Sequence, residues 1–446
     1  MSQIKFKENG YNESTIIDSN KELIKSRLFS LDPDCDEFCL GLSKNSDKDK
    51  INIMASYYVG VAWIKENALS ALVLPKRNYD YLRIFSEVLE IESEKESDYL
   101  SKSYKIFFDQ PEIEVSESLN ISSPLIMLHF VSLVKRIVKK GLKKGYVLKE
   151  ENLKSKLKGR LLFNSHLKNN IVLNREERCF CKYSEFTEDI PENRLIKKAL
   201  LVVKKSIQNI TSIKKQEDLY TNVMLDINKC LTAFFNVSEQ VVLSEIKKHS
   251  FSKVFRDYPN ALKLAQNILK HFDYSLSEAS RIKTTLPFWI DMSKLFELYV
   301  YKILNKYYPN QIQFQVEGYY KTRVDFIKTS ENEQLIIDAK YKPRYANSND
   351  RILEDISEIS RYARDKKILK KLYKDDLDRI NNEIPKCLII CPENIKYDNE
   401  EENENKTIEP FVFEKSSKIW DKAIAINSFI NFKKIIVELP LISRDF

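Results

Sequence analysis

The stretch that decides the fold reads Arg323-Val-Asp-Phe-Ile327, then a polar turn, then Gln334-Leu-Ile-Ile-Asp-Ala-Lys-Tyr341. Both apolar runs have the composition of short strands, and the polar residues between them predict a tight connection. Asp325 therefore lies on one strand, while Asp338 and Lys340 belong to the next. Since alternate residues of a strand share a face, the side chains of Asp338 and Lys340 point to the same side.

Two carboxylates and a lysine on neighbouring strands suit the metal-dependent hydrolysis of a phosphodiester. The phosphodiester is anionic, so an attacking hydroxide is repelled until a cation neutralises the phosphate. Mg²⁺ prefers carboxylate and carbonyl oxygen, keeps several waters and acidifies a bound water. We expect Asp325, Asp338 and the carbonyl of Ala339 to hold Mg²⁺, with Lys340 orienting the attacking water. The alternative is an ordinary solvated hairpin that ends in an Asp-Lys pair.

The flanking segments extend this pattern to a larger sheet. The segment 291–304 carries apolar residues at helical spacing, with Ser293 or Asp291 as a possible N-cap and Glu297 beside the apolar stripe. A second helix is predicted over 355–363, and a further strand over 387–390. The order helix, strand, strand, crossover helix, strand predicts a mixed α/β fold in which helices flank a mixed sheet.

Several segments occur together in an order that is more specific than any one of them. They are Lys158-Gly-Arg-Leu-Leu-Phe163, Phe186-Thr-Glu-Asp-Ile-Pro-Glu-Asn-Arg-Leu-Ile-Lys197, the helix over 295–304, Val324-Asp-Phe-Ile327 and Ile336-Ile-Asp-Ala-Lys-Tyr341. With these segments, over roughly 145–365, the chain resembles the McrC family, the nuclease subunits of McrBC-type modification-dependent restriction systems.

This resemblance implies a C-terminal DNA endonuclease domain of the PD-(D/E)xK fold and a separate partner. The partner is a McrB-like AAA+ GTPase hexamer that recognises methylated cytosine in double-stranded DNA, and the McrC-type chain stimulates its GTP hydrolysis. Asp325, Asp338 and Lys340 fall on the family's catalytic positions, and Glu297 falls on the acidic position of the preceding helix. Nucleases of this group often place Gln four residues before a Tyr in the crossover helix, whereas Glu358 stands there in this sequence.

The glycines exclude one class of function. No two of the seven glycines are five positions apart, as the Gly-x-x-x-x-Gly-Lys-Ser/Thr phosphate-binding loop requires. A motor that hydrolyses nucleotide through such a loop must therefore be a separate chain. Two other functions stay open, namely a stand-alone repair or recombination nuclease of the same fold and a non-catalytic activator of an NTPase.

The composition is that of an ordinary globular protein. The 446 residues are 43% hydrophobic and 31% charged, and the net charge of +8 suits a polyanion such as DNA. The N-terminus has no apolar signal run and the chain no long uncharged stretch, so we expect a cytoplasmic protein without membrane contact. The odd number of cysteines favours reduced thiols, and no histidine stands near Cys35, Cys39, Cys179 or Cys181 to support a zinc site.

Three regions are expected along the chain. A β-rich and helical region over 1–145 docks on the partner, a mostly helical middle domain covers 146–285, and the endonuclease domain covers 286–446. Within them we predict irregular structure at 1–50, strands at 51–58, 59–64 and 69–74, a loop or exposed helix at 90–98, a helix from 123 to 141 or 145, strand-like structure at 160–187, helices at 193–207, 217–235 and 259–273, and a disordered acidic run at 398–405.

Two polar features each allow two interpretations. The basic run 135–144 either contacts DNA phosphates or forms the solvated face of an amphipathic helix. Asn193 and Arg194, at a predicted helix start, either cap that helix or contact DNA or the partner.

Overall fold

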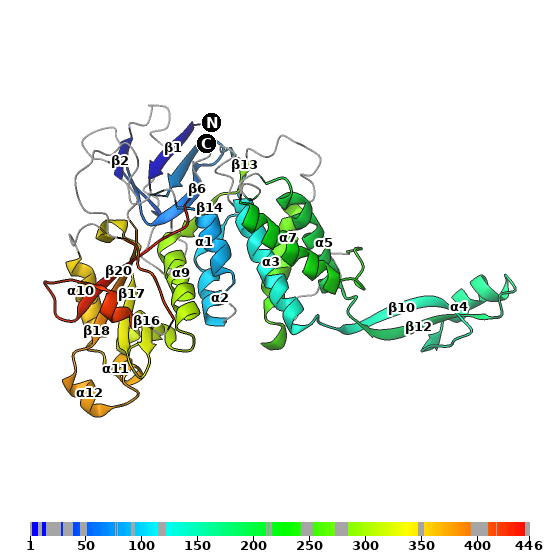
Figure 1. The fold of residues 1–446 in the computed structure, drawn as a ribbon. Coiled ribbons are helices and arrows are strands. Elements are labelled where there is room, and N and C mark those ends of the chain that lie inside the picture. Colours follow the sequence, from blue (N-terminus) through cyan, green and yellow to red (C-terminus); the bar gives the residue numbers. More distant parts are fainter. Residues whose placement is uncertain are drawn as a thin grey trace. The chain divides into compact units, whose positions relative to one another are not determined.

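The computed structural model describes residues 2–7, 11–14, 28–29, 39–44, 51–75, 77, 79–90, 94–114, 122–210, 213, 216–241, 253–272, 284–346, 352–393, 409–415 and 417–441. The chain forms two compact units (Figure 1). Unit 1 combines Met1–Glu114 with Thr285–Phe446, and unit 2 is Val115–Thr284. Unit 2 is therefore an insertion in the sequence of unit 1.

Unit 1 contains a five-stranded sheet in the order β1-β7-β6-β14-β8. β1 and β7 are parallel, and the other neighbours are antiparallel. Because β14 lies between β6 and β8, the C-terminal part of the unit supplies an inner strand to a sheet built from the N-terminal part. The strands are β1 Ser2–Lys7, β6 Tyr58–Lys65, β7 Leu69–Leu74, β8 Tyr104–Ile106 and β14 Phe288–Asp291.

A four-stranded antiparallel sheet, in the order β2-β5-β4-β3, also belongs to unit 1. It consists of β2 Tyr11–Ser14, β3 Leu28–Phe29, β4 Leu40–Lys44 and β5 Ile51–Ala55. The three strands predicted between 51 and 74 are confirmed as β5, β6 and β7. The irregular structure predicted for 1–50 is wrong, because four strands lie there. Ile4 and Phe6 alternate with polar residues in β1, which is the period of a strand.

Three helices of unit 1 pack together: α1 Tyr81–Val88, α2 Glu94–Ser101 and α9 Met292–Tyr307. The side chain of Asp291 caps α9 by accepting a hydrogen bond from the backbone N of Lys294 at 3.0 Å. The helix predicted over 291–304 is thus confirmed, with Asp291 rather than Ser293 as its N-cap. The charged run 90–98 contributes to α2, but Glu96 in that run is buried rather than exposed.

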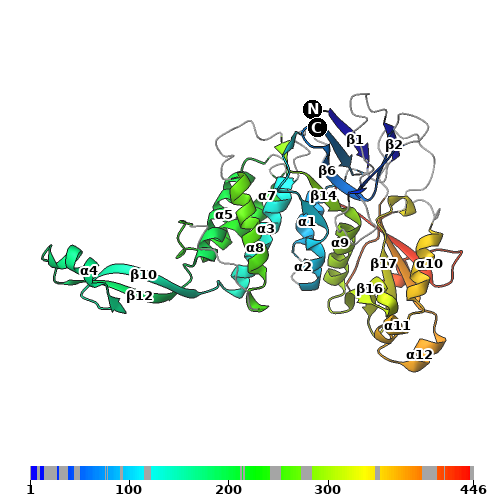
Figure 2. The same ribbon diagram turned by 180° about the vertical axis from the view of Figure 1, so that it is seen from behind.

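A six-stranded mixed sheet, in the order β15-β16-β17-β18-β20-β19, forms the rest of unit 1. Helices α10 and α11 cover it (Figure 2), and a core of Ile336, Ile356, Ile359, Ile368 and Ile389 lies between. The predicted mixed α/β fold with a helix-flanked mixed sheet is confirmed. The elements are β15 Ile312–Glu317, β16 Arg323–Thr329, β17 Gln334–Ala339, α10 Leu353–Tyr362, α11 Lys366–Leu372, α12 Leu377–Asn382, β18 Lys386–Pro392, α13 Ile419–Lys422, β19 Ile424–Ala425 and β20 Phe432–Val437.

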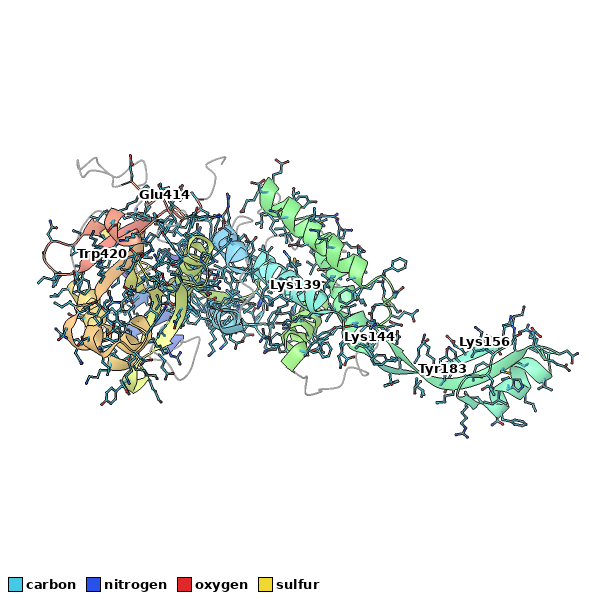
Figure 3. The ribbon with its side chains drawn as sticks, turned by 60° about the horizontal axis from the view of Figure 1, so that its bottom comes forward. Lys139, Lys144, Lys156, Tyr183, Glu414 and Trp420 are labelled. Atoms are coloured by element: carbon cyan, nitrogen blue, oxygen red, sulfur yellow. The ribbon has the colours of Figure 1, made fainter. Side chains whose placement is uncertain are left out.

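In its described residues, unit 2 has four long helices packed together and a long hairpin. The helices are α3 Ser122–Lys140, α5 Pro191–Ile207, α7 Glu217–Ala233 and α8 Asp257–Phe272, which confirms the helices predicted there. The hairpin pairs β10 Gly145–Lys154 with β12 Arg178–Thr187, and β11 Arg160–Leu161 adds a short third strand. Side chains such as Lys156 and Tyr183 stand off both sides of this hairpin (Figure 3).

The strand-like structure predicted for 160–187 is correct only at its ends. Between β11 and β12 the chain forms α4 Phe163–His166 and a π-helical turn at Leu167–Ile171. Phe163, Leu167 and Ile171 recur every four residues, which is the spacing of a helix and not of a strand.

The structure groups the expected regions differently. The first unit boundary lies near 115 rather than 145, because α3 packs on α7 and α8 of unit 2. The segments 1–114 and 285–446 form one unit, because β14 is paired within the N-terminal sheet.

The polar features of unit 2 have structural partners. Asn193 is fully buried and donates to the carbonyls of Lys143 and Glu188, and Arg194 pairs with Asp189 at 2.8 Å. Five of the six cations of the basic run form ion pairs with acidic residues of unit 2: Lys135 with Asp226, Arg136 and Lys140 with Asp257, Lys143 with Glu192 and Lys144 with Glu188. These contacts favour the structural interpretation of both features.

Some predictions concern residues outside the described ranges, namely the acidic run 398–405 and Cys35. Among the described cysteines, Cys179, Cys181, Cys230, Cys387 and Cys391 have free thiols. None of the described helices is both long and apolar enough to cross a membrane.

The described chain also has several short elements. They are β9 Ile113–Glu114, η5 Lys253–Phe255, β13 Thr284–Thr285, η8 Tyr319–Lys321 and η9 Pro343–Ala346.

Candidate active site

The candidate site lies where β16 and β17 bring their acidic residues together. β16 and β17 are antiparallel, with Phe326 opposite Ile337, so Asp325 lies beside the end of β17. Asp325 Oδ2 accepts a hydrogen bond from the backbone N of Ala339 at 2.8 Å. The hairpin predicted from the two apolar runs is therefore confirmed, and it joins Asp325 directly to the end of β17.

Lys340 is held next to both strands. Its Nζ lies 3.0 Å from Oδ2 of Asp338, whose residue is only 2% exposed. Its backbone N donates to the carbonyl of Ile390 on β18 at 2.8 Å, which fixes the chain just after β17. The structure thus brings together Asp325, Asp338 and Lys340, as the sequence predicted.

Glu297 joins the same cluster from α9. The side-chain amide of Gln315, on β15, donates to Glu297 Oε2 at 2.9 Å and to Asp325 Oδ1 at 3.3 Å. The hydroxyl of Tyr99, on α2, donates to the same Oε2 of Glu297 at 2.5 Å. The Gln315 amide therefore links the two carboxyl groups, and Tyr99 is a second uncharged donor to Glu297.

The sequence prediction missed Gln315 and Tyr99. Gln315 has φ +48°, in the left-handed region that few residues other than glycine adopt. Phe314 packs on Tyr301 of α9, whereas Val316 joins the core beneath α10 and α11. Residues two apart in a regular strand share a face, so the chain reverses its faces at Gln315. The one feature of the sequence that could have indicated Gln315 is its position as a polar residue between the apolar residues Phe314 and Val316.

Burial and mutual repulsion shift the protonation of the acidic groups. Burial raises the pKa of Glu297 to about 8 and that of Asp338 to about 6. Burial, reinforced by the charges of Glu297 and Asp338, raises the pKa of Asp325 well above its usual value. Burial would lower the pKa of Lys340, but the surrounding carboxylates outweigh it and raise that pKa. Lys340 therefore stays a cation.

Glu358 contacts the site as well. Its Oε2 lies 2.8 Å from Nζ of Lys340, and its Oε1 accepts from the hydroxyl of Tyr362 at 2.8 Å. Although burial opposes it, the Lys340 cation keeps the pKa of Glu358 below its usual value. Glu358, the residue that departs from the family pattern, is thus in direct contact with the predicted catalytic lysine, and Tyr362 contacts Glu358.

The oxygen set suits a hard cation that keeps part of its water. Oδ2 of Asp338 is buried and has no hydrogen-bond partner within the described chain, although the Lys340 ammonium lies nearby. Among the described residues, no three or more His, Cys, Asp or Glu side chains are grouped to hold a metal ion. Two carboxylates with the carbonyl of Ala339 match the ligands of Mg²⁺, which retains several waters.

Comparison with known proteins identifies the family. A family model described as the McrBC 5-methylcytosine restriction system component matches residues 53–361, which include all five predicted site residues. The chain belongs to the McrBC family. This match confirms the resemblance to McrC-type proteins that the sequence motifs carried.

Two solved structures from Thermococcus gammatolerans also resemble this McrBC family member. One is a chain from a half-complex of a tetradecameric assembly of McrB AAA+ hexamers with bound McrC, at 14% identity and a TM-score of 0.39, covering 99% of this chain and 95% of that chain. The other is a chain of the McrBC complex, at 15% identity and a TM-score of 0.29, covering 68% of this chain and 87% of that chain. No curated protein matches the sequence.

Proposed function

We propose that the chain is the endonuclease subunit of a McrBC-type restriction system, and that it hydrolyses DNA phosphodiesters with Mg²⁺. The observation that carries this proposal is the meeting of Asp325, Asp338 and Lys340 at one end of the six-stranded sheet, with Lys340 Nζ 3.0 Å from Asp338. Family membership supports the restriction role.

Each residue has a distinct role in the proposed reaction. Asp325, Asp338 and the carbonyl of Ala339 would hold Mg²⁺, which supplies an acidified water and neutralises phosphate charge when bound. Lys340, kept protonated by its carboxylate neighbours, orients the attacking water or stabilises the charge that develops on phosphorus. Glu297 is proposed as an outer carboxylate that holds water in the same cluster.

Control by a separate AAA+ GTPase hexamer is the second part of the proposal. This partner would recognise modified cytosine in double-stranded DNA, and the chain would stimulate its GTP hydrolysis. The support is family membership, together with the lack of a Gly-x-x-x-x-Gly-Lys-Ser/Thr loop in the sequence.

The region 1–145 is proposed to dock on this partner, and the hairpin of unit 2 adds a second candidate surface. Apolar side chains are strongly exposed there, and exposed apolar clusters of this kind mark protein contact sites. Tyr146 and Phe186 are 78% and 59% exposed, and their rings lie 5.1 Å apart on adjacent strands.

A cleavage assay tests the nuclease proposal. The full chain is mixed with its GTPase partner, GTP, Mg²⁺ and plasmid DNA that contains methylated cytosine. Lys340→Ala and Asp338→Asn should each lower the cleavage rate at least about 100-fold, because each removes an interaction with the reacting groups. Both variants should still stimulate GTP hydrolysis. The control is Lys386→Ala, an exposed lysine at the opposite end of the same sheet.

The same assay separates the alternatives. Equal cleavage with Mg²⁺ alone, without partner or GTP, would favour a stand-alone nuclease. Unchanged restriction of methylated DNA by Lys340→Ala in cells would favour a non-catalytic activator and contradict the proposal.

A further inference from the structure

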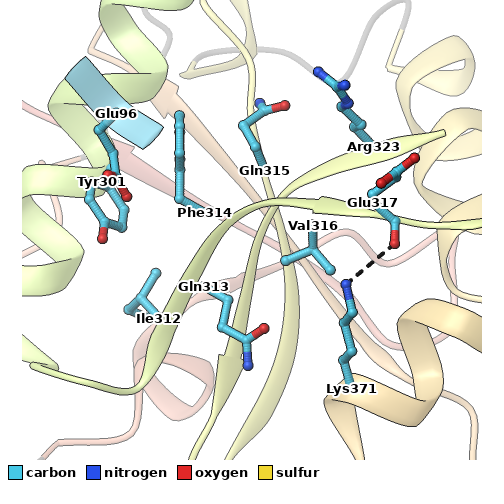
Figure 4. A pocket seen from close by; sticks show the side chains of 10 residues that line it. All are labelled: Glu96, Tyr301, Ile312, Gln313, Phe314, Gln315, Val316, Glu317, Arg323 and Lys371. Carbon is cyan, nitrogen blue, oxygen red and sulfur yellow. Dashed lines mark hydrogen bonds between the residues drawn. The ribbon is translucent and has the colours of Figure 1, made fainter. Parts of the chain in front are cut away.

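A cavity of about 530 Å³ lies beside the candidate active site, along β15 at the edge of the six-stranded sheet (Figure 4). Gln315 lines this cavity, and the same side-chain amide donates to Glu297 and Asp325. A molecule in the cavity would therefore lie one side chain away from the acidic residues of the site.

One end of the cavity presents a buried acceptor. Glu96 is only 5% exposed, and the hydroxyl of Tyr301 is hydrogen-bonded to its carboxylate. Oε2 of Glu96 has no hydrogen-bond partner in the part of the chain that the structure describes. A buried acceptor without a donor destabilises the folded protein. A ligand that donates an N–H to this oxygen would remove that cost, which favours its binding.

The remainder of the cavity has aromatic walls and a charged opposite end. Phe314 and Tyr301 contribute rings, and base stacking on aromatic side chains is common in nucleic-acid binding. Exposed Arg323 and Lys371 lie at the end away from Glu96, together with the carboxylate of Glu317 (Figure 4). These two cations can contact phosphate, whereas Glu96 can accept only from a donor group.

We propose that this cavity binds an unpaired nucleobase of the DNA, and that it prefers cytosine, adenine or guanine over thymine. The inference rests on the proposed nuclease function, which brings DNA to Gln315. Cytosine, adenine and guanine each carry an exocyclic amino group that donates to a carboxylate. Thymine has no amino group, and two carbonyls flank its single ring N–H, so the Glu96 carboxylate repels it.

The test measures binding without cleavage. Fluorescence anisotropy compares short single-stranded oligonucleotides of cytosine and of thymine on the full chain, in EDTA and low salt. The cytosine oligonucleotide should bind about tenfold more tightly, which is the effect of one hydrogen bond to a charged acceptor. In Glu96→Gln this preference should fall below about twofold, because the amide also offers a donor to thymine. Glu317→Gln is the matched control and should keep the preference.

Equal affinity of the unaltered protein for both oligonucleotides would overturn the inference. If Glu96→Gln loses its cooperative thermal transition and so does not fold, a second experiment tests the proposal with the unaltered protein. It uses a DNA strand that carries the fluorescent base 2-aminopurine at an unpaired position. Stacking on the cavity rings should quench its fluorescence on binding, and an unchanged signal would contradict the proposal. Since EDTA prevents cleavage, base preference is read separately from nuclease activity, so each proposal can fail alone.

Discussion

Tyr99 and Gln315 determine how the acidic residues of the site are held. The hydroxyl of Tyr99 and the amide of Gln315 both donate to Oε2 of Glu297, at 2.5 and 2.9 Å. Gln315 also donates to Asp325 and so bridges the two carboxyl groups, while Tyr99 holds Glu297 alone. Tyr99 acts through Glu297, so it is a positioning residue.

Tyr99→Phe tests this role. The variant keeps the ring that packs edge-on against Phe314 at 5.1 Å but removes the donor to Glu297. We expect kcat for DNA cleavage to fall roughly tenfold with KM unchanged, and the Mg²⁺ concentration for half-maximal activity to rise. Tyr307→Phe, on the same helix as Glu297, is the control. An unchanged Mg²⁺ dependence would show that Tyr99 only packs.

Glu297 also gives a pH prediction. Burial raises its pKa in the folded chain to about 8, against an ordinary value of 4.5, so the folded state holds a proton that the unfolded state has lost between these values. This group therefore lowers stability progressively as pH rises from 4.5 to 8. In EDTA at pH 9, the free energy of unfolding of Glu297→Gln should exceed that of the unaltered protein by on the order of 1–2 kcal/mol. Near pH 4 the two proteins should be equally stable. Chemical denaturation across this range measures it, and a difference that does not vary with pH would contradict the shifted pKa.

The residues of the site differ in how far the sequence could predict them. Asp325, Asp338 and Lys340 lie on two adjacent strands, so the strand period and the short turn suffice to bring them together. Tyr99 is 198 positions from Glu297, and no local pattern encodes that contact. Gln315 depends on a left-handed φ, which propensities for strands do not anticipate.

At the scale of elements, the predictions succeeded where one periodicity extends over a whole segment. The helices α3, α5, α7, α8 and α9 each carry apolar residues at helical spacing, and each was predicted. The hairpin tip was mispredicted because Phe163, Leu167 and Ile171 are exposed, so their helical spacing does not mark a buried face. Hydrophobic periodicity predicts a helix because its apolar side chains are buried against a core, and the described hairpin tip has no such core.

Gly159 in the hairpin gives a prediction at this scale. Its φ is +61°, and a Cβ would lie 2.5 Å from the carbonyl oxygen of Lys182. Gly159→Ala should destabilise the pairing of β11 with β12 by about 2 kcal/mol or more, from left-handed strain and the backbone collision together. Hydrogen exchange should accelerate in β11 and β12 but not in the helices of unit 2.

Gly141→Ala is the matched control for this experiment. Its φ is +91°, but no atom lies within 4 Å of the added Cβ, so only the strain remains. If both substitutions accelerate hydrogen exchange equally in the residues around them, the close contact with Lys182 does not contribute to the effect of Gly159→Ala.

At the scale of the molecule, unit 1 is formed from two segments that are not consecutive in the sequence. Its two parts are separated by the whole of unit 2, yet β14 lies between β6 and β8 in one sheet. The sequence suggested three consecutive regions, since composition and period describe only local structure. Pairing of β14 with strands more than 180 positions away needs the tertiary fold, because nothing in Phe288–Asp291 specifies its partners.

Unit 1 should therefore fold only when both of its parts are present. Alone, 285–446 would expose Trp289 and both edges of β14, which promotes aggregation, and would also lose the contact of Tyr79 with the carbonyl of Glu393. We expect this fragment and 1–114 to be insoluble when expressed separately and to purify as one complex when expressed together. The segment 115–284 has its own helical core and should show a cooperative thermal transition alone, as the control. A soluble 285–446 fragment with a cooperative transition would mean that the nuclease sheet does not need the N-terminal strands, and that Tyr99 reaches Glu297 from an independent domain.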